Sequence, residues 1–249
     1  MSKSRAITML PVMALVITLP LHGLAQEKRE TPQPPPAAEP AKPPAASASS
    51  AVPVYKPPLR GAPGGRVGGG TRGLGAGRAV FVLSVLAPDH TGLTVSEQPT
   101  LYWFISSKAP SPVELTVVDP RATKPLMEVR LSSPVEAGVH RIRLADHNVR
   151  LEPGVAYRWY VAVVPDANRR ARDFLTGGAI ERIEPSAELR ARLAKAGKAE
   201  APALYAEAGL WYDAIAALSA LIESAPGDAA LRRQRAAMLA QVGLPEITD

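Results

Sequence analysis

The spacing of apolar residues changes along the chain, and each change predicts a different kind of structure. Between residues 79 and 185 apolar and polar side chains alternate, which indicates β-strands. Between residues 186 and 244 apolar side chains recur every three or four positions, which indicates α-helices. The pattern therefore predicts an α+β protein with six segments, namely 1–25, 26–59, 60–78, 79–185, 186–244 and 245–249.

The alternating region predicts an antiparallel β-sandwich. Leu101, Trp103 and Ile105 share one face of their stretch, and Tyr157 and Trp159 share one face of another. Two faces that carry tryptophan predict two sheets packed on one core. The seven candidate strands are AVFVLSVLAP, QPTLYWFIS, PVELTVVD, KPLMEVRLS, GVHRIRL, GVAYRWYVAVV and FLTGGAIERIE.

The turn LEPGVAY, before the sixth candidate strand, narrows the predicted fold. The spacing of Leu151, Pro153, Gly154 and Tyr157 resembles the tyrosine corner of immunoglobulin and fibronectin type III domains, in which the phenol bonds back to the turn backbone. An ordinary turn before an aromatic strand gives the same pattern. In either case we expect Tyr157 to be structural, and we predict an immunoglobulin-like sandwich.

The helical region predicts a tetratricopeptide-like hairpin. Ser186 is a candidate N-cap, and Asp228 can cap a later helix. Gly209 and Gly243 each end a helical pattern and lie 34 residues apart, which is the tetratricopeptide period. The match covers little more than one repeat, whereas a free array needs three or more. A hairpin that only completes the core of the sandwich is the alternative.

The N-terminal residues have the form of an export signal followed by a linker. Lys3 and Arg5 precede an apolar run, and small residues lead to a cleavage position after Ala25. An uncleaved anchor is the alternative, but Pro11 and Pro20 interrupt the run. Residues 26–59 are rich in proline and alanine, which predicts a disordered tether. We therefore expect a bacterial protein, periplasmic or secreted, with no membrane span after cleavage.

Charge and cysteine content exclude several classes of function. The chain has a net charge of +6, but its basic residues are thinly spread or interleaved with acidic ones, so we expect no nucleic-acid partner. It contains no cysteine, which excludes disulfides, thiolate catalysis and iron–sulfur clusters. An exported protein without disulfides fits a bacterial periplasm.

The stretch RGAPGGRVGGGTRGLGAG, residues 60–77, raises the question of nucleotide binding. A phosphate-binding loop needs a strand before it and a helix after it, but a strand pattern follows here. Thr71 also stands where the phosphate-loop pattern requires lysine. We expect no nucleotide and no other cofactor.

Four stretches together resemble a known family. They are RGAPGGRVGGGTR, QPTLYWFIS, LEPGVAYRW and YAEAGLWYDAIAAL, and the resemblance spans about residues 60–244. The family consists of exported bacterial proteins, frequent in cyanobacteria, and is named only as domain of unknown function 928. The resemblance implies no activity, cofactor or catalytic residue. It suggests that the glycine-rich stretch belongs to the domain, and we expect that stretch to lie along a sheet edge.

The sequence offers little catalytic chemistry. His90, His140 and His147 show no metal-ligand spacing, and no serine lies in a nucleophile-elbow motif. Glu114 and other carboxylates are isolated on strands and turns. We therefore predict no catalytic, metal or cofactor residues and a protein that is not an enzyme.

Of two hypotheses of function, we predict the first and keep the second as the alternative. In the first, the protein is an interaction or scaffold module of the cell envelope whose helices present Tyr205, Trp211 and Tyr212 to a protein partner; Trp211 as a core residue is the alternative. In the second, the sandwich binds a cell-wall glycan or exopolysaccharide through aromatic side chains on its outward faces. The candidates for stacking on sugar rings are Tyr102, Phe104 and Tyr160. The sequence does not fix the oligomeric state.

Overall fold

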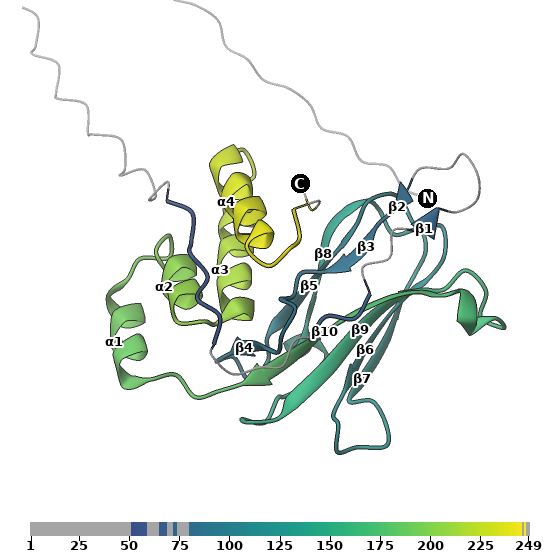
Figure 1. Ribbon diagram of the computed structural model, residues 1–249, viewed down its shortest axis with the longest axis horizontal. Helices are drawn as coiled ribbons and strands as arrows, with labels where there is room; N and C mark the ends of the chain where they lie inside the picture. The colour runs from purple at the N-terminus through teal and green to yellow at the C-terminus, as the bar shows by residue number, and fades with distance from the viewer. Residues whose placement is uncertain (1–50, 59–64, 69–71, 74–79, 246, 248–249) are drawn as a thin grey trace, which may run out of the picture. The chain divides into compact units, whose positions relative to one another are not determined.

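The alternating part of the sequence folds into two facing sheets (Figure 1). The larger sheet has the strand order β4-β10-β9-β6-β7 and the smaller has the order β3-β5-β8. Two further strands, β1 and β2, form a short separate pair. The strands are β1 (Arg72–Gly73), β2 (Val80–Phe81), β3 (Leu83–Val85), β4 (Gly92–Thr94), β5 (Thr100–Ile105), β6 (Val113–Val118), β7 (Met127–Leu131), β8 (Gly138–Arg143), β9 (Ala156–Val163) and β10 (Phe174–Arg182).

The computed structural model describes residues 51–58, 65–68, 72–73, 80–245 and 247, all within one compact unit of residues 44–249. The predicted signal peptide, residues 1–25, lies outside the described residues. So do residues 26–50 and 59 of the predicted tether, residue 79, and parts of segments 60–78 and 245–249.

The chain is α+β, as predicted, but its larger sheet is mixed rather than antiparallel. Each of the seven predicted stretches contains an observed strand. The pattern missed β4, which pairs with β10 in parallel and places Gly92 opposite Ile180. The strand has only three residues and begins with glycine, so it carries no recognisable alternation of its own. Its pairing with a distant strand stabilises it.

The core between the sheets contains the residues that the alternation predicts. Trp103 and Ile105 of β5 and Tyr157 and Trp159 of β9 are each at most 1% exposed. Alternate residues of a strand point to the same side of the sheet. Trp103 therefore shares the inward face of β5 with Ile105, and Trp159 shares the inward face of β9 with Tyr157. The structural roles predicted for Trp103 and Trp159 are thus roles in packing the two sheets together.

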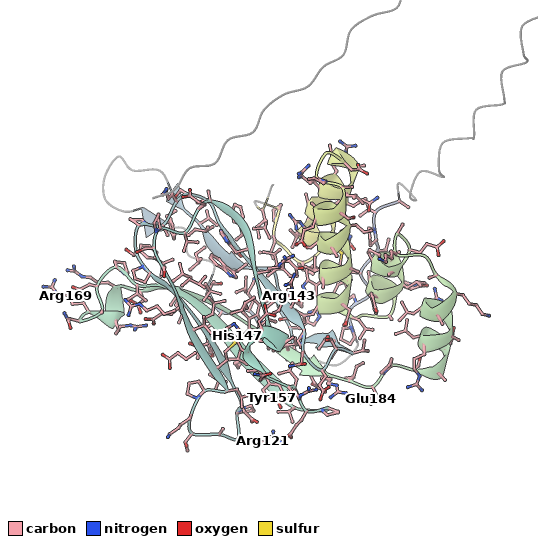
Figure 2. The ribbon with its side chains drawn as sticks, turned by 180° about the vertical axis from the view of Figure 1, so that it is seen from behind. Arg121, Arg143, His147, Tyr157, Arg169 and Glu184 are labelled. Carbon is pink, nitrogen blue, oxygen red and sulfur yellow. The ribbon has the colours of Figure 1, made fainter. Side chains whose placement is uncertain are left out.

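Tyr157 closes the turn before β9, as the spacing suggested. Its hydroxyl accepts a hydrogen bond of 3.0 Å from the backbone N–H of Glu152, and Gly154 at the turn has a φ of +74°. Leu151 is buried beneath the turn, and Pro153 bridges to Arg182 of β10. The carboxylate of Glu152 also pairs with Arg121 of the β6–β7 connection, which lies at the same end of the sheets (Figure 2).

Four helices follow the last strand, within the region predicted to be helical. Ser186 caps the first helix by accepting from the N–H of Leu189, and Asp228 caps the last by accepting from the N–H of Ala230. Gly209 and Gly243 follow helices in the left-handed conformation, with φ of +76° and +74°. The helices are α1 (Ala187–Lys195), α2 (Ala201–Glu207), α3 (Trp211–Ser224) and α4 (Ala229–Ala240).

Helix α3 covers the outer face of the smaller sheet. It contacts β4 and β5 on one side and α2 and α4 on the others. Tyr102 and Phe104, which point away from the sandwich core, are therefore only 6% and 8% exposed. The expectation that these two aromatics face solvent and stack on sugars is wrong, because the helices bury them.

The end of the predicted tether is part of the fold. Tyr55 is buried, its backbone N–H donates to the side chain of Gln241, and the N–H of Lys56 donates to the carbonyl of Ala206. In return the Gln241 amide donates to the carbonyl of Pro53. Prolines prevent these residues from forming a helix but leave them free to pack in an extended conformation. The ordered domain thus begins before residue 59.

The part of the glycine-rich stretch around Val67 lies along a sheet edge, as expected. Val67 exchanges two backbone hydrogen bonds with Gly177 of β10, of 2.9 and 2.8 Å. A Cβ atom on Gly68 would lie 2.5 Å from the carbonyl oxygen of Leu175, so the close approach requires glycine. Arg66 donates to the carbonyls of Ala87 and Val242 and thereby joins the sandwich to the end of α4.

Candidate functional site

Trp211, a predicted partner contact, lies in the core. It is fully buried, its indole N–H donates to the carbonyl of Leu86 at 2.9 Å, and its ring meets Tyr55 edge to face with 4.9 Å between centroids. Because α3 packs on the sheet, the first turn of the helix points into the protein. A direct contact between this side chain and a partner is therefore excluded in this structure, in agreement with the alternative considered from the sequence.

Tyr212 is also buried and joins the helices to the larger sheet. Its hydroxyl donates to the carbonyl of Ala179 at 3.0 Å and accepts from the indole N–H of Trp159 at 2.9 Å. Burial raises the pKa of this phenol, so it stays protonated and keeps both hydrogen bonds. Gly178 leaves room for the contact, since a Cβ there would lie 3.0 Å from the indole nitrogen of Trp159 and 3.3 Å from the Tyr212 hydroxyl. Tyr212 is thus a structural residue rather than a partner contact.

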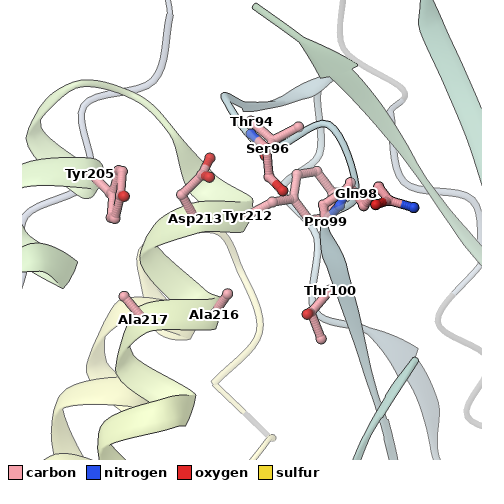
Figure 3. Close-up of a pocket in the computed structure, with 10 residues that line it drawn as sticks. All are labelled: Thr94, Ser96, Gln98, Pro99, Thr100, Tyr205, Tyr212, Asp213, Ala216 and Ala217. Carbon is pink, nitrogen blue, oxygen red and sulfur yellow. Dashed lines mark hydrogen bonds between the residues drawn. The ribbon is translucent and has the colours of Figure 1, made fainter. Parts of the chain in front are cut away.

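Tyr205, the third predicted contact, is half-buried and lines a pocket that we call the Asp213 pocket (Figure 3). This pocket of about 330 Å³ lies between helices α2 and α3 and the β4–β5 segment. Its polar lining includes Thr94, Ser96, Gln98 and Thr100.

Asp213 is the one carboxylate that lines this pocket among the residues the structure describes. Burial raises its pKa to about 6, although hydrogen bonds from the N–H of Val95 and the side chain of Thr94 oppose the shift. The bond from Val95 to Oδ2 is 3.0 Å long. Because several donors surround the carboxylate, it joins α3 to the β4–β5 segment. The other titratable side chains among the described lining residues are the phenols of Tyr205 and Tyr212.

A larger depression lies on the outer face of the five-stranded sheet, and we call it the outer-face groove. Its volume is about 610 Å³. Side chains at outward positions of three adjacent strands form its floor, because residues that face each other in register share one side of a sheet. The groove is lined by Val67, Glu114, Thr116, Tyr160, Ala162, Arg170, Asp173 and Leu175.

Tyr160 is the aromatic residue of the groove. It stands between Thr116 of β6 and Gly177 of β10, and it is half-buried. A Cβ atom on Gly177 would lie 2.5 Å from a ring carbon of Tyr160, so the phenol ring lies against the bare backbone of that glycine. Leu175 is 48% exposed beside it, and Val67 is 42% exposed. The groove therefore offers an aromatic ring and apolar surface to solvent.

Arg170 fixes the charged side of the groove. It begins the short 3-10 turn Arg170–Arg172 between β9 and β10, and its guanidinium donates to Glu114 at 2.6 Å and to Asp173 at 2.7 Å. The two carboxylate side chains are only 12% and 11% exposed. Atom Oδ1 of Asp173 is buried without a hydrogen-bond partner among the described residues.

The sequence indicated Tyr160 but not the groove. Glu114 looked isolated on its strand, and Arg170 and Asp173 belong to a connection with no recognisable motif. The alternation of apolar and polar residues predicts that Glu114, Thr116 and Tyr160 point outward. It does not predict that β6 and β9, which carry them, lie side by side in the sheet.

The three histidines beyond the predicted signal peptide, His90, His140 and His147, do not form a shared site. Nε2 of His90 is 2.9 Å from the hydroxyl of Tyr55, and burial lowers the pKa of His90 although Asp89 opposes the shift. His140 stacks on Trp103 with 4.3 Å between ring centroids. His147 is exposed in the turn after β8 (Figure 2). Within the described part of the chain, no three histidine or acidic residues are grouped so that they could hold a metal ion.

Comparison with known proteins gives a family. A family described as Domain of Unknown Function (DUF928) matches residues 67–249. The chain belongs to the DUF928 family. Membership of DUF928 confirms the family resemblance predicted from the sequence and assigns no activity. No curated protein and no solved structure matches the chain.

Among the residues that the structure describes, no helix of this DUF928 protein is long and apolar enough to cross a bilayer.

Proposed function

We propose that this DUF928 protein is an exported, non-enzymatic protein of the bacterial cell envelope, periplasmic or secreted, that binds a glycan in the outer-face groove. The observation that carries the proposal is the ring of Tyr160, which lies on the open face of a sheet beside fixed polar side chains. An aromatic ring with one apolar face and a polar hydroxyl suits a ligand that has both characters.

The chemistry of the groove matches that of a sugar chain. A pyranose ring presents C–H groups on its faces, which can pack on Tyr160 and Leu175, and hydroxyl groups at its edges. Glu114 and Asp173 can accept hydrogen bonds from those hydroxyls, and Arg170 can donate to their oxygens. Because Arg170 holds both carboxylates, the polar groups are oriented before a ligand arrives, which lowers the entropic cost of binding.

The same ion pairs support binding rather than hydrolysis. A glycosidase of the common kind needs one carboxylic acid with a raised pKa and a second carboxylate that attacks or activates water. Both groove carboxylates instead form ion pairs with the same guanidinium, that of Arg170. This arrangement suits two hydrogen-bond acceptors.

Docking of a protein partner on the helices is the other function expected from the sequence. Tyr205 supports it, since this side chain is half-buried and lines the Asp213 pocket. The burial of Trp211 and Tyr212 leaves that proposal with less support than glycan binding.

We also infer which known folds the sheets and the helices are related to. The bond from Glu152 to Tyr157 supports an immunoglobulin-like sandwich, although the parallel β4–β10 pair departs from a purely antiparallel one. The matching backbone conformations of Gly209 and Gly243 support a tetratricopeptide-like origin of the helical hairpin.

Affinity gels that contain purified cell-wall glycans or exopolysaccharides test the proposed function. We expect a glycan to retard the wild-type protein, and we expect Tyr160→Ala to weaken binding at least tenfold, about 1.4 kcal/mol. Tyr160→Phe keeps the ring and should retain most of the affinity. Tyr205→Ala removes a half-buried tyrosine from the Asp213 pocket and serves as the matched control.

Two results would contradict glycan binding. One is that no glycan retards the wild-type protein. The other is that Tyr160→Ala and Tyr205→Ala weaken binding equally while both variants remain folded by circular dichroism. Loss of a co-purifying protein on Tyr205→Ala alone would instead support docking on the helices.

A further inference from the structure

The Asp213 pocket is separate from the outer-face groove and differs from it in chemical character. The two sites share no described lining residue. With a volume of about 330 Å³, the Asp213 pocket can hold a small molecule or one end of a larger one. Tyr205, Asp213 and Ala217 line it from helices α2 and α3, and the hydroxyls of Ser96 and Thr100 line it from the β4–β5 segment (Figure 3).

Asp213 gives this pocket a negative charge that no basic side chain of the described residues balances. The described lining contains no lysine, arginine or histidine, and Asp213 forms no ion pair within the part of the chain that the structure describes. Neutral donors hold the carboxylate instead, namely the N–H of Val95 and the side chain of Thr94. Removing a carboxylate from water is costly unless an opposite charge lies beside it. A cation in the pocket would supply that charge.

The neutral groups of the pocket favour a cation that donates hydrogen bonds. The hydroxyl oxygens of Ser96 and Thr100 can each accept them. Burial raises the pKa of Tyr205, and the charge of Asp213 adds to the shift, so this phenol stays neutral and its ring can attract a cation. A primary ammonium group carries one positive charge and three N–H donors and has no acceptor. Such a group therefore matches one carboxylate surrounded by hydroxyls.

We propose that the Asp213 pocket binds the primary ammonium group of a small amine or of an amino sugar. Asp213 provides the negative charge, Ser96 and Thr100 provide further acceptors, and Tyr205 lines the side of α2. Mg²⁺ and Ca²⁺ fit this lining less well, because they bind several oxygen ligands and the described lining has one carboxylate. The proposal does not depend on glycan binding in the outer-face groove.

Isothermal titration of the full chain at pH 7 and constant ionic strength tests this site. The probes are glucosamine and putrescine, with N-acetylglucosamine as the neutral counterpart of glucosamine. Each is titrated into the wild type and into Tyr160→Ala, which removes the aromatic ring of the outer-face groove. We expect at least one amine to bind both proteins with equal affinity, and N-acetylglucosamine to bind Tyr160→Ala at least tenfold more weakly than that amine. Preference for glucosamine would identify an amino sugar as the ligand, whereas preference for putrescine would identify an alkyl amine.

Two substitutions in the pocket should weaken amine binding for different reasons. Asp213→Asn removes the charge but keeps the size of the side chain, and we expect at least a tenfold loss of affinity. Ala217→Leu keeps the charge but fills the pocket from α3, where Ala217 is partly exposed, and should also weaken binding at least tenfold. Glu97→Gln is the matched control, because it removes an equal charge next to Ser96 from a side chain that is 43% exposed and does not line the pocket.

The proposal is overturned if neither amine binds the wild type, or if Glu97→Gln weakens binding as much as Asp213→Asn. Loss of amine binding in Tyr160→Ala would place the amine in the outer-face groove and would equally overturn it. If Asp213→Asn fails to fold by circular dichroism, Ala217→Leu decides the question, since unchanged affinity in that variant would show that the amine binds elsewhere. Failure of glycan binding in the groove leaves these outcomes unaffected, because every amine titration is repeated in Tyr160→Ala.

Discussion

The outward faces of the two sheets carry aromatic residues at similar positions, but only one face is open. Tyr102 and Phe104 of the smaller sheet are buried beneath α3, whereas Tyr160 of the larger sheet is half-buried in a groove. Strand alternation determines which side chains share a face. It does not determine whether another element covers that face, because covering depends on contacts between distant parts of the chain.

Substitutions where the helices cover the sheet should lower the free energy of unfolding the most. Trp211→Ala removes the indole that contacts Tyr55 and Leu86, and we expect the free energy of unfolding to fall by about 3–5 kcal/mol, since a cavity remains in a packed core. Urea denaturation followed by circular dichroism measures the change. A loss below about 1 kcal/mol would contradict the assignment of Trp211 to the core.

The free energy of unfolding should fall less when only a hydroxyl is removed from the contact between α3 and the larger sheet. Tyr212→Phe leaves the indole N–H of Trp159 without its partner and removes one bond to Ala179. The expected decrease is about 1–3 kcal/mol, the cost of leaving a buried polar group unsatisfied. Chemical denaturation of the variant gives the value, and wild-type stability would show that the hydroxyl does not join helix to sheet.

Asp213, which joins α3 to the β4–β5 segment, should make the stability of the protein sensitive to pH. Its pKa is raised from 3.8 to about 6, so between these values the folded state holds a proton that the unfolded chain has lost. The free energy of unfolding therefore falls as pH rises through this window. Asp213→Asn should remove this dependence and leave the variant more stable than the wild type at pH 8, by on the order of 1 kcal/mol.

Thermal melts of both proteins at pH 4, 5, 6 and 8 measure the effect of Asp213. The two proteins should differ least at pH 4, where the wild-type carboxyl is protonated. Parallel curves over the whole range would contradict the burial of this carboxylate.

The open face should be the most tolerant of change. Tyr160→Ala should alter the free energy of unfolding by less than about 1 kcal/mol, because the ring is partly in water and rests on Gly177 rather than in the core. Urea denaturation of the Tyr160→Ala and Trp211→Ala variants, measured side by side, compares their losses of unfolding free energy. A loss as large as that of the tryptophan variant would mean that the groove is part of the structural core.

The parts of the fold that obey local rules could be predicted from the sequence. Ser186 and Asp228 cap helices because their short polar side chains reach nearby N–H groups, and Gly209 follows a helix because it adopts positive φ. The bond from Glu152 to Tyr157 likewise spans only five residues. Each of these features depends on side chains that are neighbours in the chain.

The parts that depend on distant contacts could not be predicted. Strand β4 exists because β10 lies beside it, and Arg170 reaches Glu114 only because the β9–β10 connection folds back over the sheet. The outer-face groove arises from such contacts, and its residues therefore share no motif along the chain. The aromatic alternation still placed Tyr160 on an outward face.

The packing of Tyr55 has a practical consequence for producing the protein. The family match begins at residue 67, yet Tyr55 covers the edge of Trp211 and bonds to His90. A shortened protein that starts at residue 67 would expose apolar surface at the base of the helices, and such surface promotes aggregation. The smallest well-behaved recombinant fragment should therefore start near residue 51, ahead of the boundary that the family defines.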